Sequence, residues 1–225
     1  MSIAARLSAP APFLFDLDGT LADTLPDIAA SCNHVRVRFG LPALALPEVR
    51  TFVGDGARTL LARALAPALP AAAAVREHRL DEAFASYVDH HRDQCTRLAT
   101  VYPGVTAKLT ALRHGGHALG VVTNKPEQFA RPLLAHLGLL DLLGIVVGGD
   151  TLPQKKPDPA PLQFALRALG GDAPHGTMVG DGVQDLRAGK AAGLRTIACL
   201  YGYGDAAALR REGADVYWQH FDEPV

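Results

Sequence analysis

The chain has 225 residues, of which 48% are hydrophobic and 20% charged, the composition of a globular protein that can bury a core. A formal net charge of -1 leaves no basic surplus for nucleic acid, and no apolar run is long enough for a membrane span or a signal peptide. Its three cysteines have no metal-site or disulfide spacing. We therefore expect a cytoplasmic protein, monomeric or homodimeric, with no nucleic-acid or membrane partner.

Short apolar runs recur along the chain, and each ends at a polar or glycine-rich turn. Because they are short and apolar on both faces, they predict buried parallel strands. Helical patterns opened by proline and closed by glycine lie between several of them. This alternation predicts an α/β fold, a doubly wound parallel sheet with a Rossmann-like core. The expected strands are 13–15, 118–122, 145–147, 177–179 and 196–200.

The segment from about residue 21 to residue 100 breaks the alternation and is predicted to be entirely helical. We interpret it as a small inserted cap domain over the carboxyl edge of the sheet. Residues 1–20 and 101–225 would then form the catalytic α/β core, and residues 21–100 the helical cap. Two apolar stripes at helical spacing support this interpretation, one formed by Leu60, Leu61, Ala64 and Leu65 and the other by Leu80, Phe84, Val88 and His91.

The first expected strand runs directly into two aspartates, Asp16 and Asp18, followed by Gly19 and Thr20. Side chains two apart on an extended segment point the same way, so the two carboxylates converge and repel each other. A divalent hard cation is the natural partner for such a pair. Alone, the string also fits a polar turn that caps the next helix.

Two further strings place phosphate-binding chemistry near strand ends. Thr123 and Asn124 follow the second strand and offer a hydroxyl and an amide, although the same pair could simply cap a helix. Lys156 lies just before Pro157 and can place a point charge on a phosphate, although a solvated basic loop is the plainer alternative. Open α/β sheets bind ligands at this edge, which favours the functional interpretation.

A third string supplies two more carboxylates. Asp181 ends the strand at 177–179, and Asp185 follows four residues later, on the same face if a helix has begun. A favourable charge in the first turn of a helix would account for Asp185 but poorly for Asp181. Asp181 is therefore a candidate metal ligand opposite Asp16.

Taken in chain order, these four strings resemble the four motifs of the haloacid dehalogenase superfamily, and the resemblance covers the whole chain. Within that superfamily the chain looks like the bacterial phosphoglycolate phosphatases. The further strings that carry this likeness are Phe52-Val53-Gly54-Asp55-Gly56-Ala57, Tyr102-Pro103-Gly104-Val105, Val122-Thr123-Asn124-Lys125-Pro126, Gly148-Gly149-Asp150 and Tyr201-Gly202-Tyr203-Gly204.

The resemblance implies a magnesium-dependent phosphatase. Asp16 would attack phosphorus and form an aspartyl-phosphate, and Asp18 would protonate the leaving group and then activate water. Mg²⁺ would bind the Asp16 carboxylate, the Asp18 backbone carbonyl and Asp181. Asp185 would stand behind them and orient Lys156 or a metal-bound water.

The resemblance also implies the substrate contacts. Thr123 and Lys156 would hold the phosphoryl oxygens and share in catalysis by offsetting the charge that develops there. The other expected contacts come from the two core strings and from the cap: Gly19, Thr20, Asn124, Gly54, Asp55, Gly56 and Arg63.

Two departures from the family pattern bear on the substrate. Gly182-Val183-Gln184 stands where Ser-Arg-Asn is common, which removes a hydroxyl beside the metal and one charge. Asp55 stands where asparagine is common, and an acid facing the substrate would disfavour a carboxylate-bearing ester.

The expected activity is hydrolysis of a small phosphate ester, 2-phosphoglycolate to glycolate. Another metabolite is the main alternative, either a sugar phosphate such as N-acetylmuramic acid 6-phosphate or pyrophosphate. A phosphomutase would use the same two aspartates, and a non-catalytic binding protein would be expected to have lost one of the reactive residues.

Overall fold

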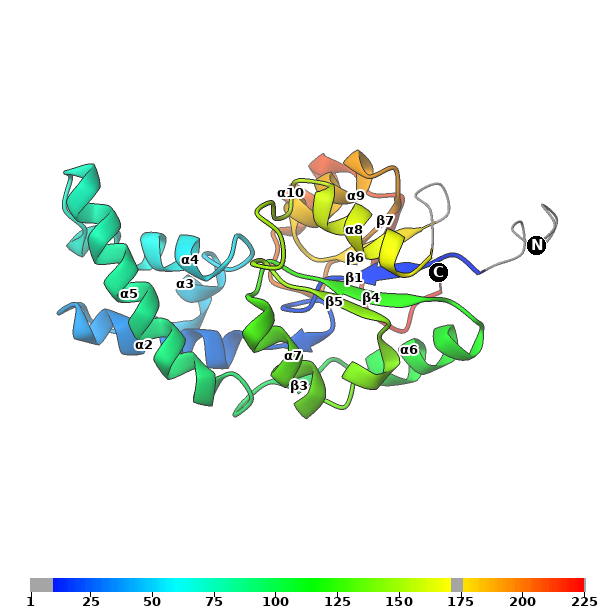
Figure 1. Cartoon of the computed structure of the whole chain (residues 1–225), viewed down its shortest axis with the longest axis horizontal. Helices are drawn as coiled ribbons and strands as arrows, with labels where there is room; N and C mark the ends of the chain where they lie inside the picture. The colour runs from blue at the N-terminus through cyan, green and yellow to red at the C-terminus, as the bar shows by residue number, and fades with distance from the viewer. Residues whose placement is uncertain (1–9, 171–175, 225) are drawn as a thin grey trace.

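The computed structural model describes residues 10–170 and 176–224, and in this part of the chain one six-stranded parallel sheet forms the centre of the fold (Figure 1). The strands run in the order β5-β4-β1-β6-β7-β8. The prediction of a doubly wound α/β fold is confirmed. The strands are β1 (Phe13–Phe15), β4 (Leu119–Val122), β5 (Ile145–Val147), β6 (Thr177–Gly180), β7 (Arg195–Cys199) and β8 (Val216–Trp218).

Helices cover both faces of the sheet because successive strand residues point to opposite sides. Phe13 and Phe15 pack into the cluster that includes the apolar faces of α6 (Val105–His114) and α7 (Glu127–His136). Leu14 packs into the other cluster, with α8 (Ala160–Ala168) and α9 (Val183–Ala191). Figure 1 shows α6 and α7 on one side of the strands and α8 and α9 on the other. The helix α10 (Ala206–Glu212) packs beside α9, and a short 3-10 helix, η2, spans Leu140–Leu142.

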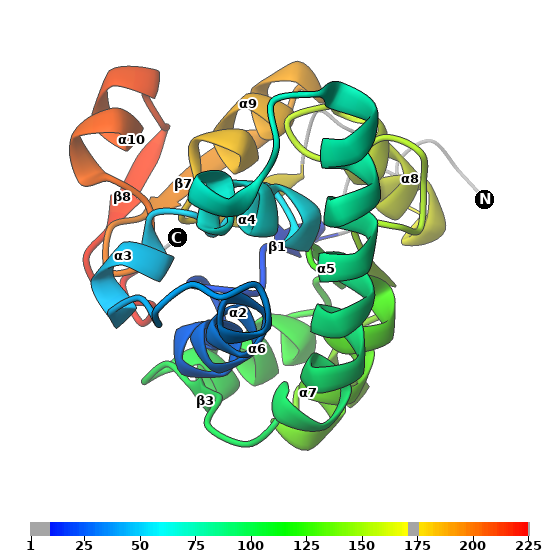
Figure 2. The same ribbon diagram turned by 90° about the vertical axis from the view of Figure 1, so that its left-hand side faces the viewer.

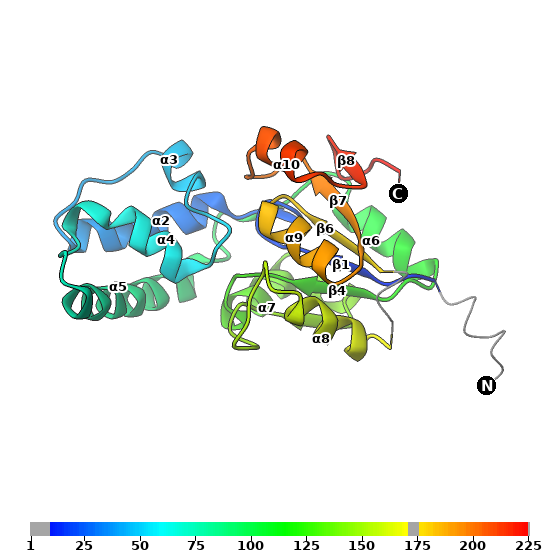
Figure 3. The same cartoon turned by 90° about the horizontal axis from the view of Figure 1, so that it is seen from above.

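Four α-helices and one 3-10 helix form a separate layer beyond one end of the sheet, here called the helical layer (Figure 3). It has its own apolar core, which includes Cys32, Leu61 and Ala83. Two residues from the sheet part of the chain, Phe129 and Tyr203, also pack against this core. The helical layer consists of α2 (Leu25–Arg38), α3 (Leu46–Arg50), α4 (Ala57–Ala64), the 3-10 helix η1 (Ala66–Ala68) and α5 (Ala73–Gln94).

A short two-stranded sheet joins the two chain crossings between the helical layer and the main sheet. In it β2 (Ala22–Asp23) pairs antiparallel with β3 (Thr100–Val101), with Ala22 opposite Val101. The prediction that the segment from 21 to 100 is entirely helical is therefore wrong at both ends. Pairing satisfies the backbone groups of two strands that are too short to show an alternating pattern in the sequence.

Figure 2 looks at the molecule from the helical layer, with α2, α4 and α5 in front of β1. These helices therefore lie in front of the strand in this view, and their role as a cap stays a prediction. None of the helices in the described ranges has both the length and the apolar character of a membrane span.

Candidate active site

The ends of three neighbouring strands place polar side chains at one edge of the sheet. β1 leads to Asp16, β4 to Thr123 and β6 to Asp181, and β1 lies between β4 and β6 in the sheet. All three residues line a cavity of ≈ 680 Å³ whose opposite wall comes from the helical layer. The parallel order of the strands is thus the reason that residues more than a hundred positions apart meet in one site.

Lys156 lies at the centre of this group and is only 2% exposed. Its Nζ lies 2.9 Å from Oδ1 of Asp16 and 2.7 Å from Oδ1 of Asp185, and it donates to the carbonyl oxygen of Val122 at 2.6 Å. Burial alone would lower the pKa of Lys156, but the two carboxylates outweigh it and raise the pKa above its usual value. The ammonium is therefore held in its charged form, with three oxygen partners.

Three buried carboxylates form a cluster at this edge, and two of them, Asp16 and Asp185, contact Lys156. Oxygens of Asp16, Asp181 and Asp185 lie within 4.8 Å of one another. Burial and the neighbouring negative charges raise the pKa of Asp16 to about 6 and that of Asp181 to about 8, with Lys156 opposing the shift at Asp16. One ammonium among three carboxylates leaves the cluster short of positive charge, which is why the pKa values of Asp16 and Asp181 are raised, and all the donors are oxygens. This donor set fits a divalent hard cation.

Asp185 is more central than the sequence indicates. It is fully buried, pairs with Lys156, and its Oδ2 accepts a hydrogen bond of 2.9 Å from the backbone N–H of Gly182. The Asp18 carboxylate, in contrast, is not one of the three clustered groups, and only its backbone carbonyl was expected at the metal.

The Asp18 carboxylate is held by two partners on the side of the helical layer. Thr24 Oγ1 donates to Asp18 Oδ1 at 2.6 Å, and Lys125 Nζ lies 3.1 Å from the same oxygen. Lys125 is 7% exposed and lines the cavity. Sequence reasoning did not assign Lys125 a role, although its position two residues after Thr123 in a chain poor in lysine was a usable signal.

Gly19 and Thr20, expected to contact the substrate, instead support Asp181. Thr20 is fully buried and its Oγ1 donates to Asp181 Oδ1 at 2.8 Å. Gly19 has φ 85°, and a Cβ at that position would collide with the Asp181 carboxylate. Neither residue belongs to the described wall of the cavity, so the contact that the structure shows for both is with Asp181, and their contact with a substrate stays a prediction.

The expected contacts from the helical layer divide into two groups. Gly54 and Gly56 line the cavity, but Asp55 and Arg63 are absent from its described wall. The guanidinium of Arg63 takes up the Asp55 carboxylate in an ion pair in which each side chain is 40% exposed. The two charges therefore pair with each other outside the described wall of the cavity, and their contact with a substrate stays a prediction.

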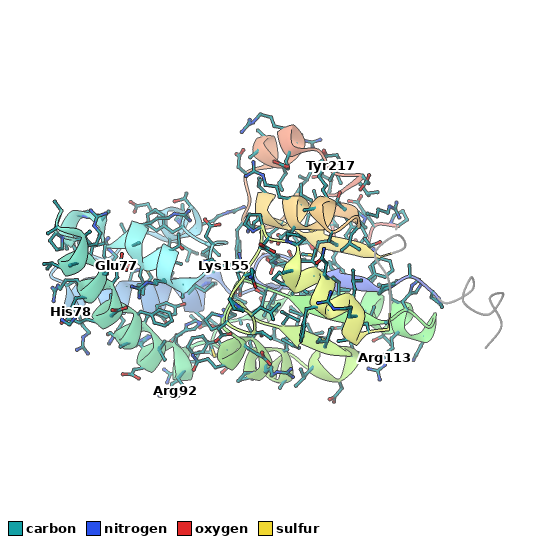
Figure 4. The ribbon with its side chains drawn as sticks, turned by 45° about the horizontal axis from the view of Figure 1, so that its top comes forward. Glu77, His78, Arg92, Arg113, Lys155 and Tyr217 are labelled. Carbon is teal, nitrogen blue, oxygen red and sulfur yellow. The ribbon has the colours of Figure 1, made fainter. Side chains whose placement is uncertain are left out.

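Core side chains hold the loop around Gly54 against the sheet edge. Asn124 lines the cavity, and its Nδ2 donates to the carbonyl oxygens of Gly54 at 2.9 Å and Lys156 at 3.0 Å. Lys155 Nζ donates to the carbonyl oxygen of Asp55 at 2.7 Å. Figure 4 shows Lys155 where the segment before α8 faces the helical layer. Asn124 therefore joins the two walls of the site.

Two aromatic elements of the site were missed from the sequence. Tyr87 and His91 on α5 are buried and line the cavity. Tyr203, after β7, donates its N–H to Asp181 at 2.7 Å, while its hydroxyl donates to Asp23 at 2.8 Å and accepts from the N–H of Leu25 at 2.9 Å. The apolar stripe on α5 pointed to His91, but nothing in the sequence indicated the Tyr203 contacts.

The family model described as haloacid dehalogenase-like hydrolase matches residues 13–199. The chain is 39% identical over 93% of its length to phosphoglycolate phosphatase 1 of Pseudomonas aeruginosa, covering 75% of that protein. It is 42% identical over 90% of its length to a plasmid-encoded phosphoglycolate phosphatase of Cupriavidus necator, covering 86% of it.

Solved structures with this fold include a crystal structure described as a predicted phosphoglycolate phosphatase from Haemophilus somnus 129PT. It has a TM-score of 0.87 and 30% identity, with 96% of each chain covered. The structure of CbbY from Rhodobacter sphaeroides in complex with phosphate has a TM-score of 0.76 at 24% identity, covers 95% of this chain and 96% of its own, and shows the shared fold alone.

Proposed function

The chain belongs to the haloacid dehalogenase-like hydrolases and is a phosphoric monoester hydrolase, and we propose that it converts 2-phosphoglycolate to glycolate and phosphate. The observation that carries the proposal is the convergence of Asp16, Lys156, Asp181 and Asp185 at one sheet edge, closed in by a helical layer. The names of the relatives support the choice of 2-phosphoglycolate.

In the proposed reaction the Asp16 carboxylate attacks phosphorus in line with the ester bond. A bond forms between phosphorus and the Asp16 oxygen as the bond to the leaving oxygen breaks, and Asp18 gives that oxygen a proton. Water then attacks the aspartyl-phosphate while Asp18 accepts its proton, which releases phosphate and restores Asp16. Thr24 and Lys125 fix the Asp18 carboxylate for both steps.

The phosphoryl oxygens would be held from two sides. Thr123 ends β4 beside Asp16 and lines the cavity, so its hydroxyl can donate to one oxygen. Lys156 offers a positive charge to another and keeps Asp16 in place through their 2.9 Å contact. The same lysine is restrained by Asp185, so the charge is preorganised before the substrate arrives.

Mg²⁺ is the proposed cofactor, held by the carboxylates of Asp16 and Asp181 and the backbone carbonyl of Asp18. Asp185 stays with Lys156 and the Gly182 N–H, in a supporting position. When bound, Mg²⁺ supplies positive charge that offsets the negative charge of the phosphoryl group. Thr20 and Tyr203 hold the two oxygens of Asp181 at 2.8 and 2.7 Å and so fix this ligand.

The α2–α5 layer is the proposed cap, with the domain boundary between residues 20 and 21 and between residues 100 and 101. It would exclude bulk water and select the leaving group. The charge of Asp55 was an objection to a carboxylate-bearing substrate, and its pairing with Arg63 outside the described wall removes that objection. Lys125 meanwhile adds a positive charge to the cavity.

A sugar phosphate is the second candidate because of the size of the cavity. Its ≈ 680 Å³ is larger than a two-carbon leaving group needs and falls within the range of about 300–1,000 Å³ typical of sites for larger ligands.

The deciding experiment is phosphate release from 2-phosphoglycolate, N-acetylmuramic acid 6-phosphate, other sugar phosphates and pyrophosphate, each with Mg²⁺ and with chelator. We expect the highest kcat/KM for 2-phosphoglycolate and none with chelator. Asp16→Asn is the control for contaminating phosphatase, because an amide cannot serve as the nucleophile. A higher kcat/KM for a sugar phosphate would reassign the substrate, and full activity of Asp16→Asn would refute the mechanism.

A further inference from the structure

The cavity wall contains a buried histidine that the proposed reaction does not use. His91 on α5 is fully buried, and its Nε2 has no hydrogen-bond partner among the described residues. Its Nδ1 lies 2.9 Å from Oγ of Ser31 on α2. Because His91 is also among the residues that line the cavity, a ligand bound there is the candidate partner for Nε2. A buried polar atom without a partner is costly, which makes a missing partner the natural explanation.

The imidazole is held in one orientation by its neighbours. Tyr87 stacks on the ring with a centroid distance of 4.8 Å, and Phe129 meets it edge-on at 4.9 Å. Tyr87 and Phe129 line the cavity as well. Rigid aromatic packing on two sides, together with the contact to Ser31, is what a binding group requires to select a ligand by geometry. The outer face of α5 carries charged residues instead, such as Arg92, which is 63% exposed in its side chain and points away from the site in Figure 4.

The ring is neutral throughout the physiological range. Burial, the charge of Lys125 and the neighbouring His90 together lower the pKa of His91 to about 2. A neutral imidazole carries one proton, on Nδ1 or on Nε2. When the Ser31 hydroxyl donates to Nδ1, that proton resides on Nε2, and His91 presents an N–H donor to the cavity.

His91 lies on the side of the cavity from which the leaving group departs. Asp18 must touch the leaving oxygen in order to protonate it, and Lys125 is in contact with Asp18 at 3.1 Å. Lys125 is close enough to His91 for its charge to act on the ring, and all three residues line the same cavity. Atoms of the substrate that extend beyond the leaving oxygen therefore come within the region of Lys125 and His91.

We propose that His91 determines specificity by donating a hydrogen bond from Nε2 to an oxygen on the leaving group of the substrate. The preferred substrates are small phosphate monoesters whose leaving group carries an acceptor oxygen, and Lys125 adds the charge that favours a carboxylate. For 2-phosphoglycolate that oxygen belongs to the carboxylate, and in this form the inference rests on the proposed function. Ser31 is a positioning residue, because it acts through the orientation and the proton of His91.

The test compares His91→Gln with wild type on 2-phosphoglycolate and on ethyl phosphate, which replaces the carboxylate with a methyl group. We expect kcat/KM for 2-phosphoglycolate to fall roughly 10- to 100-fold, mainly through KM, because the hydrogen bond to a charged oxygen is lost. For ethyl phosphate the change should stay below about 3-fold, since it makes no such bond. The result that overturns the inference is an unchanged ratio of the two kcat/KM values.

His90→Gln is the matched control. His90 precedes His91 on the same helix and its Nδ1 lies 3.1 Å from the same Ser31 Oγ, but it is not part of the described cavity wall. This variant should keep the wild-type preference for 2-phosphoglycolate. A loss of preference equal to that of His91→Gln would assign the effect to the packing of α2 against α5 and overturn the role of Nε2.

A second variant covers the case in which His91→Gln does not fold, and a second pair of substrates covers the case in which 2-phosphoglycolate is not the preferred ester. If thermal unfolding shows that His91→Gln does not fold, the Ser31→Ala variant is tested in its place. Ser31→Ala should raise KM for 2-phosphoglycolate but not for ethyl phosphate, and an equal change in both KM values would overturn the inference. If wild type prefers another ester, the proposed substrate fails, and the variants are compared on that ester and on its analogue without the acceptor oxygen. Loss of preference there sustains the role of His91, and its retention refutes it.

Discussion

Replacement of Lys156 by methionine tests the electrostatic logic of the site without any assumption about the substrate. Methionine keeps an unbranched chain of similar length but removes the only cation that contacts Asp16 and Asp185 in the described structure. The two carboxylates are 6% and 0% exposed, so water cannot replace the lost charge at low cost. The carbonyl oxygen of Val122 also loses its donor.

The expected magnitude follows from the burial of the pair. Removing one partner of a buried ion pair costs about 3–5 kcal/mol, because the remaining charge is left uncompensated. For a chain of this size 1 kcal/mol corresponds to roughly 2–4 °C in Tm, so Lys156→Met should lower Tm by roughly 6–20 °C. Lys155→Met is the matched control. Its side chain bonds only the carbonyl oxygen of Asp55 and should change stability by less than about 1 kcal/mol.

The assay is chemical and thermal unfolding in the presence of chelator, so that no bound metal masks the charge imbalance. The double variant Lys156→Met/Asp185→Asn should recover part of the loss, because it removes one of the uncompensated carboxylates. A Lys156→Met protein as stable as Lys155→Met would refute the reasoning, since the buried carboxylates would then not depend on the lysine. A double variant less stable than the single one would equally contradict it.

Three further predictions concern the metal, the general acid and acid stability. Mg²⁺ at 100 times its Kd should stabilise wild type against thermal unfolding by about 2.7 kcal/mol, and the Asp181→Asn variant should lose most of this stabilisation. If Mg²⁺ stabilised the variant as much as wild type, Asp181 would not be part of the metal site. Lys125→Met should slow turnover of ethyl phosphate at least about 10-fold more than turnover of p-nitrophenyl phosphate, because the p-nitrophenolate leaves without a proton from Asp18. Equal slowing of both substrates would show that Lys125 does not act through Asp18. The folded protein holds the pKa of His91 at about 2, whereas a histidine in the unfolded chain has its ordinary pKa near 6.5, so unfolding takes up a proton below about pH 6.5. The free energy of unfolding therefore falls by up to about 1.4 kcal/mol per pH unit as the pH drops. Between pH 4.5 and 6.5 the free energy of unfolding of His91→Gln should depend less steeply on pH than that of wild type, and an equal dependence would count against a buried neutral ring.

The main sheet and the placement of the candidate site residues at strand ends were accessible from the sequence because each is a local signal. A short apolar run followed directly by a carboxylate or a hydroxyl places Asp16, Thr123 and Asp181 at strand ends without any knowledge of distant contacts. The parallel order of the strands then brings them together. The strand β8 was missed, since Val216–Trp218 is only three residues long and two of its three side chains are only partly buried.

The supporting contacts were not accessible because they depend on side chains that meet only in three dimensions. Lys125 contacts Asp18 across 107 positions, and the hydroxyl of Tyr203 reaches the N–H of Leu25 across 178. Such pairs leave no periodicity in a single sequence. The pairing of Asp55 with Arg63 spans only eight positions, yet the loop conformation decides that the acid turns outward. The sequence therefore shows the charge of Asp55 but not its ion pair with Arg63.

The two departures from the family pattern meet at one place, the loop around Gly54. Its carbonyl oxygen accepts from Asn124 at 2.9 Å and from Gln184 at 3.3 Å, and the next carbonyl oxygen, that of Asp55, accepts from Lys155 at 2.7 Å. All three contacts end on backbone oxygens, which are present whatever side chain stands at position 55. A change at this position can therefore alter the outer surface of the helical layer without removing these three contacts. Gln184 lies on α9, the helix that also carries Asp185, and it donates to the carbonyl oxygen of Gly54 in the helical layer. This departure from the family pattern therefore adds a contact between the two walls of the site, and Asp185 keeps its contact with Lys156.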